Sequence, residues 1–215
     1  MLKTVPPRAF DEIGDAIGML RNGILVFDTM DMSGVLADCC LYDWFEDGRN
    51  LVHRYARKHP ARPGTDEAYL LNAYCHATYR ILTIHSAVPD AGLYVYDTLN
   101  EEELFLMDLG FSRSLKQGGV ALATRTIPLG DYCMTGGAPL PITSADAVES
   151  TLLEMDEGPM LAPRDGPAGF SLSIVSACLG AGAAEHVKYV GAEDKPKERP
   201  RMPGWQGSKR RHRPS

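Results

Sequence analysis

Hydrophobic residues in the first third of the chain recur at helical spacing. The apolar positions that define a first helix, over residues 9–21, are Phe10, Ile13, Ile17 and Leu20. Further apolar positions follow beyond Ser33, and Gly48 is expected to end one helix before Asn50 caps the next. Thr65 is expected to cap another helix that runs to about His76. The pattern therefore predicts a helical segment over residues 1–77.

At Thr78 the pattern changes to β-branched and aromatic residues separated by Gly, Pro, Asn and Asp, which is typical of short strands. The predicted strands cover residues 79–84, 93–98, 103–108, 120–127 and 131–135. An open sheet of this size would expose its edges, so we expect a small antiparallel meander or an SH3-like barrel of four to five strands over residues 78–142.

Helical spacing returns at Ser144, which is expected to cap a helix that ends near Gly158. A second, weaker helix is predicted over residues 170–189, and Pro, Lys, Arg and Gly dominate from about Glu193 onward. The predicted fold class is α+β. N-terminal helices pack on the β-module, C-terminal helices cover residues 143–192, and residues 193–215 form a disordered basic tail.

Charge is divided unevenly along the 215 residues, although the net charge is only -6. Residues 195–215 contain eight Lys or Arg and one acid, which leaves a net charge of about -13 on the remainder. An acidic body with a basic tail suits either a polyanionic partner or a contact of the tail with the body's own acidic face.

The five cysteines show neither paired C-x-x-C spacing nor the even number of a disulfide framework. The N-terminus has no apolar stretch typical of a signal peptide, so we expect a cytoplasmic protein. Residues 166–184 carry no charge, but they are rich in Gly, Ala and Ser. That composition argues against a membrane helix.

Thiols and imidazoles provide the first candidate site. Cys39 and Cys40 with His53 or His76 are a possible nucleophile and base, whereas free cysteines on an amphipathic helix are usually core residues, which is the interpretation we favour. A looser group has no metal-ligand spacing. It consists of His53, His59, Cys75, His76 and His85. We expect no metal and no cofactor.

Carboxylates provide the second candidate site, beside one predicted hairpin. They are Asp97, Glu101, Glu102, Glu103 and Asp108. Such a group can hold Mg²⁺ or supply an acid and a base, but a solvated turn that protects a sheet edge has the same composition and is preferred here. Arg125 is expected to pair with Asp97 or Asp108 across the sheet. The pairs Gly118-Gly119 and Gly136-Gly137 are expected to be turn residues, because neither lies in a phosphate-binding pattern.

Several segments together carry a resemblance. They include Asp43-Trp44-Phe45, Gly92-Leu93-Tyr94-Val95-Tyr96-Asp97, Phe105-Leu106-Met107-Asp108 and Leu122-Ala123-Thr124-Arg125. Over about residues 36–142 the chain resembles uncharacterised bacterial proteins that join a helical segment to a small β-module. Some of those relatives carry a cysteine-rich zinc tail of the SEC-C kind, which this chain lacks. The resemblance implies a fold rather than an activity.

The basic tail provides the third candidate site. Its residues expected to contact nucleic acid are Lys209, Arg210, Arg211, Arg213 and Trp205. Basic side chains neutralise phosphates and an aromatic ring can stack on an unpaired base. We therefore expect a non-catalytic adaptor or binding module that contacts a protein, with a tail that adds attraction to RNA, DNA or another polyanion.

The alternative is a small-molecule enzyme, hydrolase-like, with a polar cleft between the helices and the β-module. That function requires a pocket in which at least three side chains converge from a set that includes Asp97, Asp108, Arg125 and the histidines.

Overall fold

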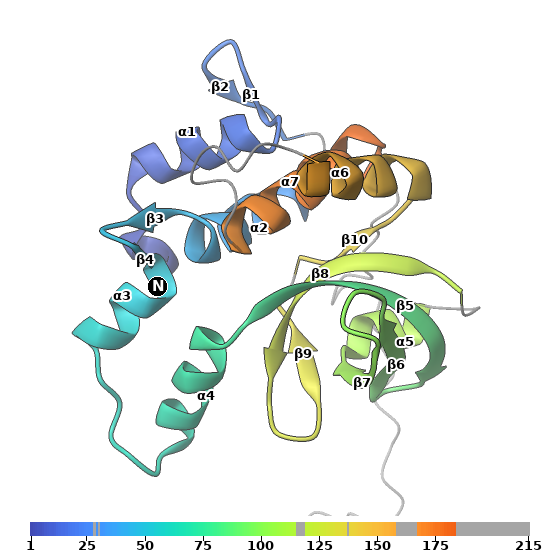
Figure 1. Cartoon of the computed structure of the whole chain (residues 1–215). Helices are drawn as coiled ribbons and strands as arrows, with labels where there is room; N and C mark the ends of the chain where they lie inside the picture. Colours follow the sequence, from blue (N-terminus) through green and yellow to red (C-terminus); the bar gives the residue numbers. More distant parts are fainter. Residues whose placement is uncertain (28, 30, 115–118, 137, 158–166, 184–215) are drawn as a thin grey trace, which may run out of the picture.

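The computed structural model describes residues 1–27, 29, 31–114, 119–136, 138–157 and 167–183. In chain order its elements are η1 (Leu2–Thr4), α1 (Pro7–Ala16), β1 (Leu20–Arg21), β2 (Ile24–Leu25), α2 (Asp31–Tyr42), β3 (Phe45–Glu46), β4 (Arg49–Asn50), α3 (Leu51–Lys58), α4 (Asp66–Cys75), β5 (Thr78–Val88), β6 (Gly92–Asp97), β7 (Glu102–Met107), α5 (Leu109–Ser114), β8 (Ala121–Pro128), β9 (Cys133–Thr135), β10 (Leu140–Pro141), α6 (Ala145–Glu157) and α7 (Pro167–Gly180). Figure 1 shows α1, α2, α6 and α7 as a helical layer above β5, β6, β7, β8 and β9, with α3 and α4 beside these strands.

Two short hairpins interrupt the helical layer where longer helices were expected. The first, β1–β2, turns at Asn22 and Gly23, and the second, β3–β4, turns at Asp47 and Gly48. All four turn residues have positive φ, between 53° and 75°, as two-residue turns of this kind require. The first helix therefore ends at Ala16 rather than near residue 21, and Gly48 forms a turn rather than a helix end.

The predicted helix caps at Asn50, Thr65 and Ser144 are confirmed. The Asn50 side chain accepts a hydrogen bond from the His53 backbone N–H at 2.9 Å, and the Thr65 hydroxyl accepts one from Ala68 at 3.2 Å. The Ser144 hydroxyl accepts one from Ala147, also at 3.2 Å. Each cap satisfies a backbone donor that the first helical turn leaves without a partner.

The five predicted strands form a closed barrel, in the order β8-β5-β6-β7-β9. Strand β9 closes it by pairing with β7 through Leu106 and Cys133 and with β8 through Thr126 and Thr135. The β7–β9 pair is parallel, whereas every other pair in the sheet is antiparallel. Two short elements that were not predicted, α5 and β10, complete this half of the chain (Figure 1).

The described residues form two principal hydrophobic clusters. One lies inside the barrel and includes Leu82, Val95 and Leu106. The other lies between the helical layer and the barrel, where Ile81 and Ala123 meet apolar residues of α1, α2 and α7. The helices thus pack directly on β5 and β8. No helix in the described ranges is long and apolar enough to cross a membrane.

Candidate functional site

A buried group of charged residues joins the helical layer to the barrel. Arg125, on β8, donates from Nε to Asp38 Oδ2 at 2.9 Å and from a terminal nitrogen to Asp43 Oδ2 at 2.5 Å. Asp38 lies on α2 and Asp43 directly follows it. The Ser171 hydroxyl, on α7, donates to Asp43 Oδ1 at 2.7 Å. We refer to these four residues as the seam cluster, because each is buried and together they link α2, α7 and β8.

Aromatic rings and a glycine enclose the guanidinium of the seam cluster. The Arg125 guanidinium carbon lies 4.4 Å from the Tyr42 ring centroid and 5.3 Å from that of Tyr79, which are cation–π distances. A Cβ on Gly136 would lie 2.8 Å from Asp38 Oδ1 and 3.2 Å from Arg125 Cβ. Gly136, expected to be only a turn residue, is therefore needed here because the backbone approaches the cluster closely.

Two carboxylates share one guanidinium in the seam cluster, which leaves an excess of negative charge in a buried place. Burial raises the pKa of Asp43 to about 7, although Arg125 and Ser171 act in the opposite direction. Burial likewise raises the pKa of Asp38 against the effect of Arg125. Burial lowers the pKa of Arg125, but its two carboxylate partners outweigh burial and raise it. Such a coupled pair of acids favours binding one proton near neutral pH.

Cys39 adds a thiol beside the seam cluster, so that ligand atoms of Asp38, Cys39 and Asp43 lie within 4.8 Å of one another. Burial, followed by the charges of Asp43 and Asp38, raises the pKa of Cys39 well above its ordinary value. Metals bind the thiolate, and the guanidinium already supplies positive charge to both carboxylates. The donor set is therefore better suited to a buried ion pair than to a metal centre.

Cys40 is also a core residue rather than a nucleophile in this geometry. Its thiol donates to the Ala9 carbonyl at 3.5 Å, and burial raises its pKa to about 12. At neutral pH it is a thiol, whereas a nucleophilic cysteine is activated by a base or by a lowered pKa.

Two cavities meet at Asp43. The larger, of about 720 Å³, lies between α1 and α7, and we call it the α1–α7 cleft. The smaller, of about 330 Å³, lies between the helices and the barrel and is lined by polar residues that include His53 and Arg125. Asp43, Phe45 and Ala168 line both cavities.

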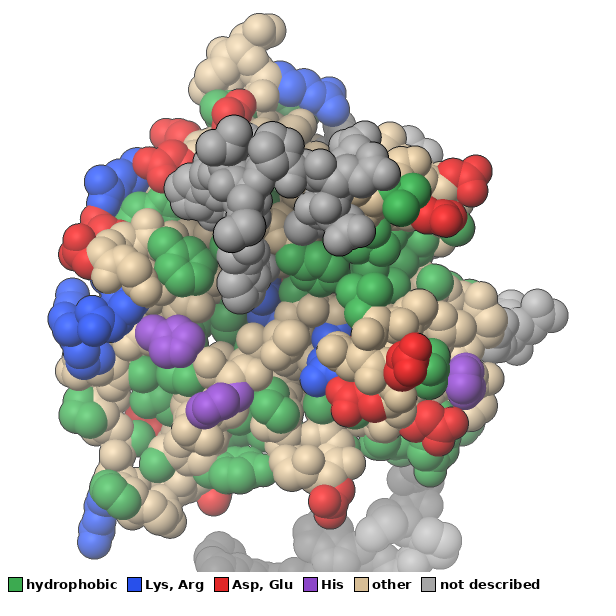
Figure 2. All heavy atoms as spheres, viewed as in Figure 1, with side chains coloured by type: hydrophobic (Ala, Val, Ile, Leu, Met, Phe, Trp, Pro, Cys, Tyr) green, Lys and Arg blue, Asp and Glu red, His purple; other side chains and the backbone are tan. Residues whose placement is uncertain are grey.

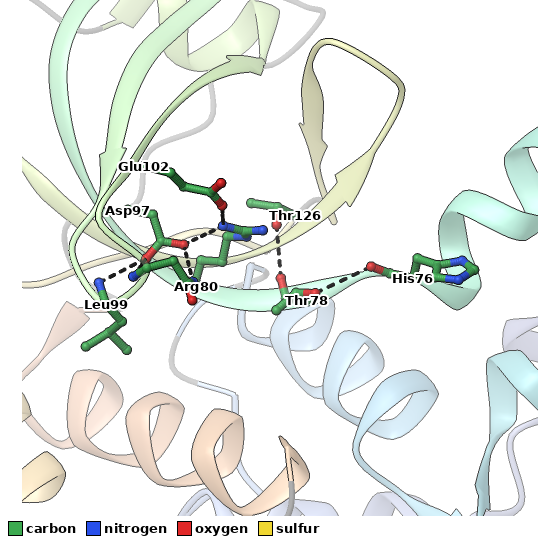
Figure 3. A network of polar contacts seen from close by, with 8 residues as sticks. His76, Thr78, Arg80, Asp97, Leu99, Glu102 and Thr126 are labelled. Atoms are coloured by element: carbon green, nitrogen blue, oxygen red, sulfur yellow. Dashed lines mark hydrogen bonds and ion pairs between the residues drawn. The ribbon is translucent and has the colours of Figure 1, made fainter.

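The expected pairing of Arg125 with Asp97 or Asp108 is wrong, because Arg80, not Arg125, pairs with Asp97. Figure 3 shows the Arg80 guanidinium between the carboxylates of Asp97 and Glu102, which come from the ends of β6 and β7. Arg80 donates to Asp97 Oδ2 at 2.5 Å and also pairs with Glu102. Asp97 is fully buried and additionally accepts hydrogen bonds from Leu99 and Asn100.

The other carboxylates of the second candidate site have local roles. Asp108 accepts hydrogen bonds from the Phe111 backbone at 2.9 Å and from the Thr135 hydroxyl at 3.0 Å, so it begins α5 and holds β9. Glu101 and Glu103 are exposed beside the turn. In the described part of the chain these acids do not bring three ligand atoms within metal-binding reach.

The histidines are dispersed rather than gathered in one site. His53 contacts its own cap residue Asn50, and the His76 ring bonds to the Asn72 carbonyl at 2.8 Å. His59 packs on Tyr55, and His85 stacks on Tyr96 with ring centroids 6.0 Å apart. Of the thiol and imidazole group, only His53 and Cys75 line the smaller cavity.

The outer surface of the barrel presents large apolar side chains to solvent. Tyr94 is 54% exposed and meets Phe105 edge-to-face, with ring centroids 5.1 Å apart. Met107 and Val88 are also exposed, and the four residues come from β5, β6 and β7. We call them the barrel face. In Figure 2 acidic side chains lie over the barrel at the lower right and also over the helices at the upper left, while many basic ones lie over the helices on the left.

The third candidate site, Lys209, Arg210, Arg211, Arg213 and Trp205, lies outside the described residues. Its expected contact with nucleic acid therefore stays a prediction from the sequence.

Fold and contacts define an α+β protein in which a buried ion cluster fixes a helical layer to a closed five-stranded barrel. The chain belongs to the family of unknown function DUF7986, whose model matches residues 1–155. The matched range contains Asp38, Asp43 and Arg125 but ends before α7 and Ser171. No curated protein and no solved structure matches the chain.

Proposed function

We propose that this protein is a non-catalytic binding module that contacts a protein partner through the barrel face. The observation that carries the proposal is the apolar cluster on the outer surface of the barrel, in which Tyr94 and Met107 are exposed and Phe105 is half-buried. Exposed aromatic and Met side chains grouped on one surface are typical of protein contact sites. The nearby exposed acids Glu101 and Glu103 favour a partner that presents apolar and basic groups.

A photo-crosslinking experiment tests the barrel face directly. The reactive amino acid p-benzoylphenylalanine replaces Tyr94 in one variant and, as a control, the equally exposed Leu153 of α6 in another. We expect a discrete crosslinked protein from position 94 and none from position 153, and we expect a Met107→Ser substitution to reduce its yield. Equal crosslinking from both positions would contradict a specific partner site.

The basic tail is proposed to add non-specific attraction to RNA, DNA or another polyanion. Its eight basic residues predict binding that weakens steeply as salt rises, because each neutralised phosphate releases counterions. Fluorescence anisotropy with a single-stranded oligonucleotide, measured for the full chain and for a chain lacking residues 195–215, tests this. Absence of binding at low salt, or binding that survives the deletion, would refute the role of the tail.

The alternative function, a hydrolase-like enzyme, requires a pocket in which at least three of the expected polar side chains converge. The smaller cavity brings together Arg125 and His53 from the expected set, whereas Asp97 and Asp108 are engaged elsewhere. The converging polar groups therefore number two rather than the required three. We retain the binding module as the proposal.

We also infer that the protein acts in the cytoplasm of a bacterium. The resemblance to bacterial proteins supports this origin, and the five free thiols suit a reducing compartment. Cell fractionation of the native host, followed by immunoblotting, tests the location, and recovery in a secreted fraction would contradict it.

A further inference from the structure

The α1–α7 cleft has the size and the lining of a small-molecule site. Its volume of about 720 Å³ lies within the range of about 300 to 1,000 Å³ typical of such sites. On one wall, Ala168, Gly169 and Ala177 of α7 have little or no side chain and so leave space. On the other, Ile13 of α1 and the largely buried Trp44 supply apolar surface.

The charges that line the cleft have one sign. Among the described lining residues there are two acids, Glu12 and Asp43, and no Lys, Arg or His. Asp43 shares the Arg125 guanidinium with Asp38 and accepts a hydrogen bond from Ser171, so its charge is largely held within the seam cluster. The Arg8 guanidinium carbon lies 5.1 Å from the Trp44 ring centroid, but Arg8 is paired with Glu46, so Glu12 is the principal uncompensated charge of the cleft. Glu12 Oε2 accepts a hydrogen bond from Trp44 Nε1 at 2.8 Å, which fixes the carboxylate beside the indole ring.

Glu12 retains acceptor capacity for a ligand. A carboxylate has two oxygens and about four lone-pair positions, of which the Trp44 indole uses one. Clefts lined by charges of one sign and by low-dielectric walls concentrate the field and attract ligands of opposite charge. An ammonium group at Glu12 would leave an attached ring to contact Trp44, Ile13 and Leu172, which also lines the cleft.

We propose that the α1–α7 cleft binds a small organic cation, in which a protonated amine is linked to an aromatic body. The amine lies at Glu12 and the aromatic body lies between α1 and α7. This site is separate from the barrel face, so the two proposals stand or fall independently.

Titration of the full-length protein with 2-(2-naphthyl)ethylamine tests the site. The matched probes are the neutral 2-(2-naphthyl)ethanol and the anionic 3-(2-naphthyl)propionate. The chain has two tryptophans, so the indole N–H resonance of Trp44 is assigned in ¹⁵N-labelled protein by comparison with Trp205→Phe. We expect a saturable shift of the Trp44 resonance with the amine, about threefold weaker binding of the alcohol, and no binding of the propionate.

Two variants locate the charge. Glu12→Gln keeps an acceptor for the Trp44 indole but removes the charge, so we expect amine affinity to fall to that of the alcohol, with alcohol affinity unchanged. Asp11→Asn, an exposed neighbour on α1 that does not line the cleft, makes a matched control and is expected to leave both affinities unchanged. Ala177→Leu, which fills the cleft, is expected to abolish binding of both probes while thermal unfolding shows that the fold is retained.

Three results would overturn the proposal. They are no shift of the Trp44 resonance at millimolar amine, equal affinity for all three probes, and amine affinity that Glu12→Gln leaves unchanged. Should Ala177→Leu fail to fold, the comparison between Glu12→Gln and Asp11→Asn still decides the outcome.

Discussion

Replacing Arg125 with Met should destabilise the protein severely, because it removes the cation of the seam cluster. The side chains of Arg125, Asp38 and Asp43 are only 5%, 7% and 2% exposed, so solvent cannot compensate for the loss. Breaking a buried ion pair on one side costs about 3 to 5 kcal/mol, since an unpaired buried charge remains. We expect a loss of this size in the free energy of unfolding at pH 8, measured by urea denaturation.

The same variant should recover stability at lower pH. Without the guanidinium, the two carboxylates avoid burial of charge by binding protons, so the loss at pH 5.5 should be smaller than the loss at pH 8. Adding Asp38→Asn and Asp43→Asn should recover part of the stability at pH 8. Arg113→Met, which removes an exposed cation, serves as a control and should change stability by less than about 0.5 kcal/mol. A loss below about 1 kcal/mol at pH 8 for Arg125→Met, or an equal loss at both pH values, would refute the reasoning.

Three further outcomes follow from single contacts. Because the pKa of Asp43 is raised to about 7 from 3.8, the folded state binds more protons between these values and the protein gains stability as the pH falls through this window. Asp43→Asn should flatten that dependence in urea titrations at several pH values. Asp97 behaves oppositely: burial raises its pKa, but hydrogen bonds from Asn100, Arg80 and Leu99 outweigh burial and lower it. Above pH 3.8 the wild type should therefore be more stable than Asp97→Asn, and this difference in the free energy of unfolding should vanish in more acid solution. The same urea titrations measure it. Gly92→Ala should cost about 1 to 3 kcal/mol in thermal unfolding, because its Cβ would lie 2.3 Å from the Leu106 carbonyl oxygen, whereas Gly110→Ala, with its nearest neighbour at 3.5 Å, should be nearly neutral.

The elements that the sequence predicted well are those decided by neighbouring residues. The caps at Asn50 and Thr65 depend on side chains that bond to a backbone group three residues away. The strands depend on β-branched and aromatic runs bounded by turn residues. The hairpins at Asn22-Gly23 and Asp47-Gly48 carried the same kind of local signal. They were missed because their strands are two residues long and lie among helical spacings.

The seam cluster was beyond local reasoning, because its bonds join residues 82, 87 and 128 positions apart. One signal was nevertheless present. Arg125 stands in the middle of an otherwise uncharged strand, and a buried guanidinium requires a buried acid. Asp38 and Asp43 lie in the largely apolar stretch from Met32 to Trp44. A search of the sequence for a buried acid could therefore have identified them. Asp97 and Asp108 were wrongly expected to pair with Arg125, because only acids of the same sheet were considered as its partners.

Closure of the barrel through β9 has a consequence for how the protein folds. The hairpins β5–β6, β6–β7 and β8–β9 can form between sequence neighbours, but β9 has only three residues and must also pair with β7, which lies much earlier in the chain. Pairing between distant segments incurs its entropy cost before the contacts form, which slows folding. Until β9 pairs with β7, these two strands have open hydrogen-bonding edges to which another chain can add. We therefore expect refolding yield to fall as protein concentration rises, and a substitution that weakens β9 to deepen that dependence before it measurably lowers the equilibrium stability.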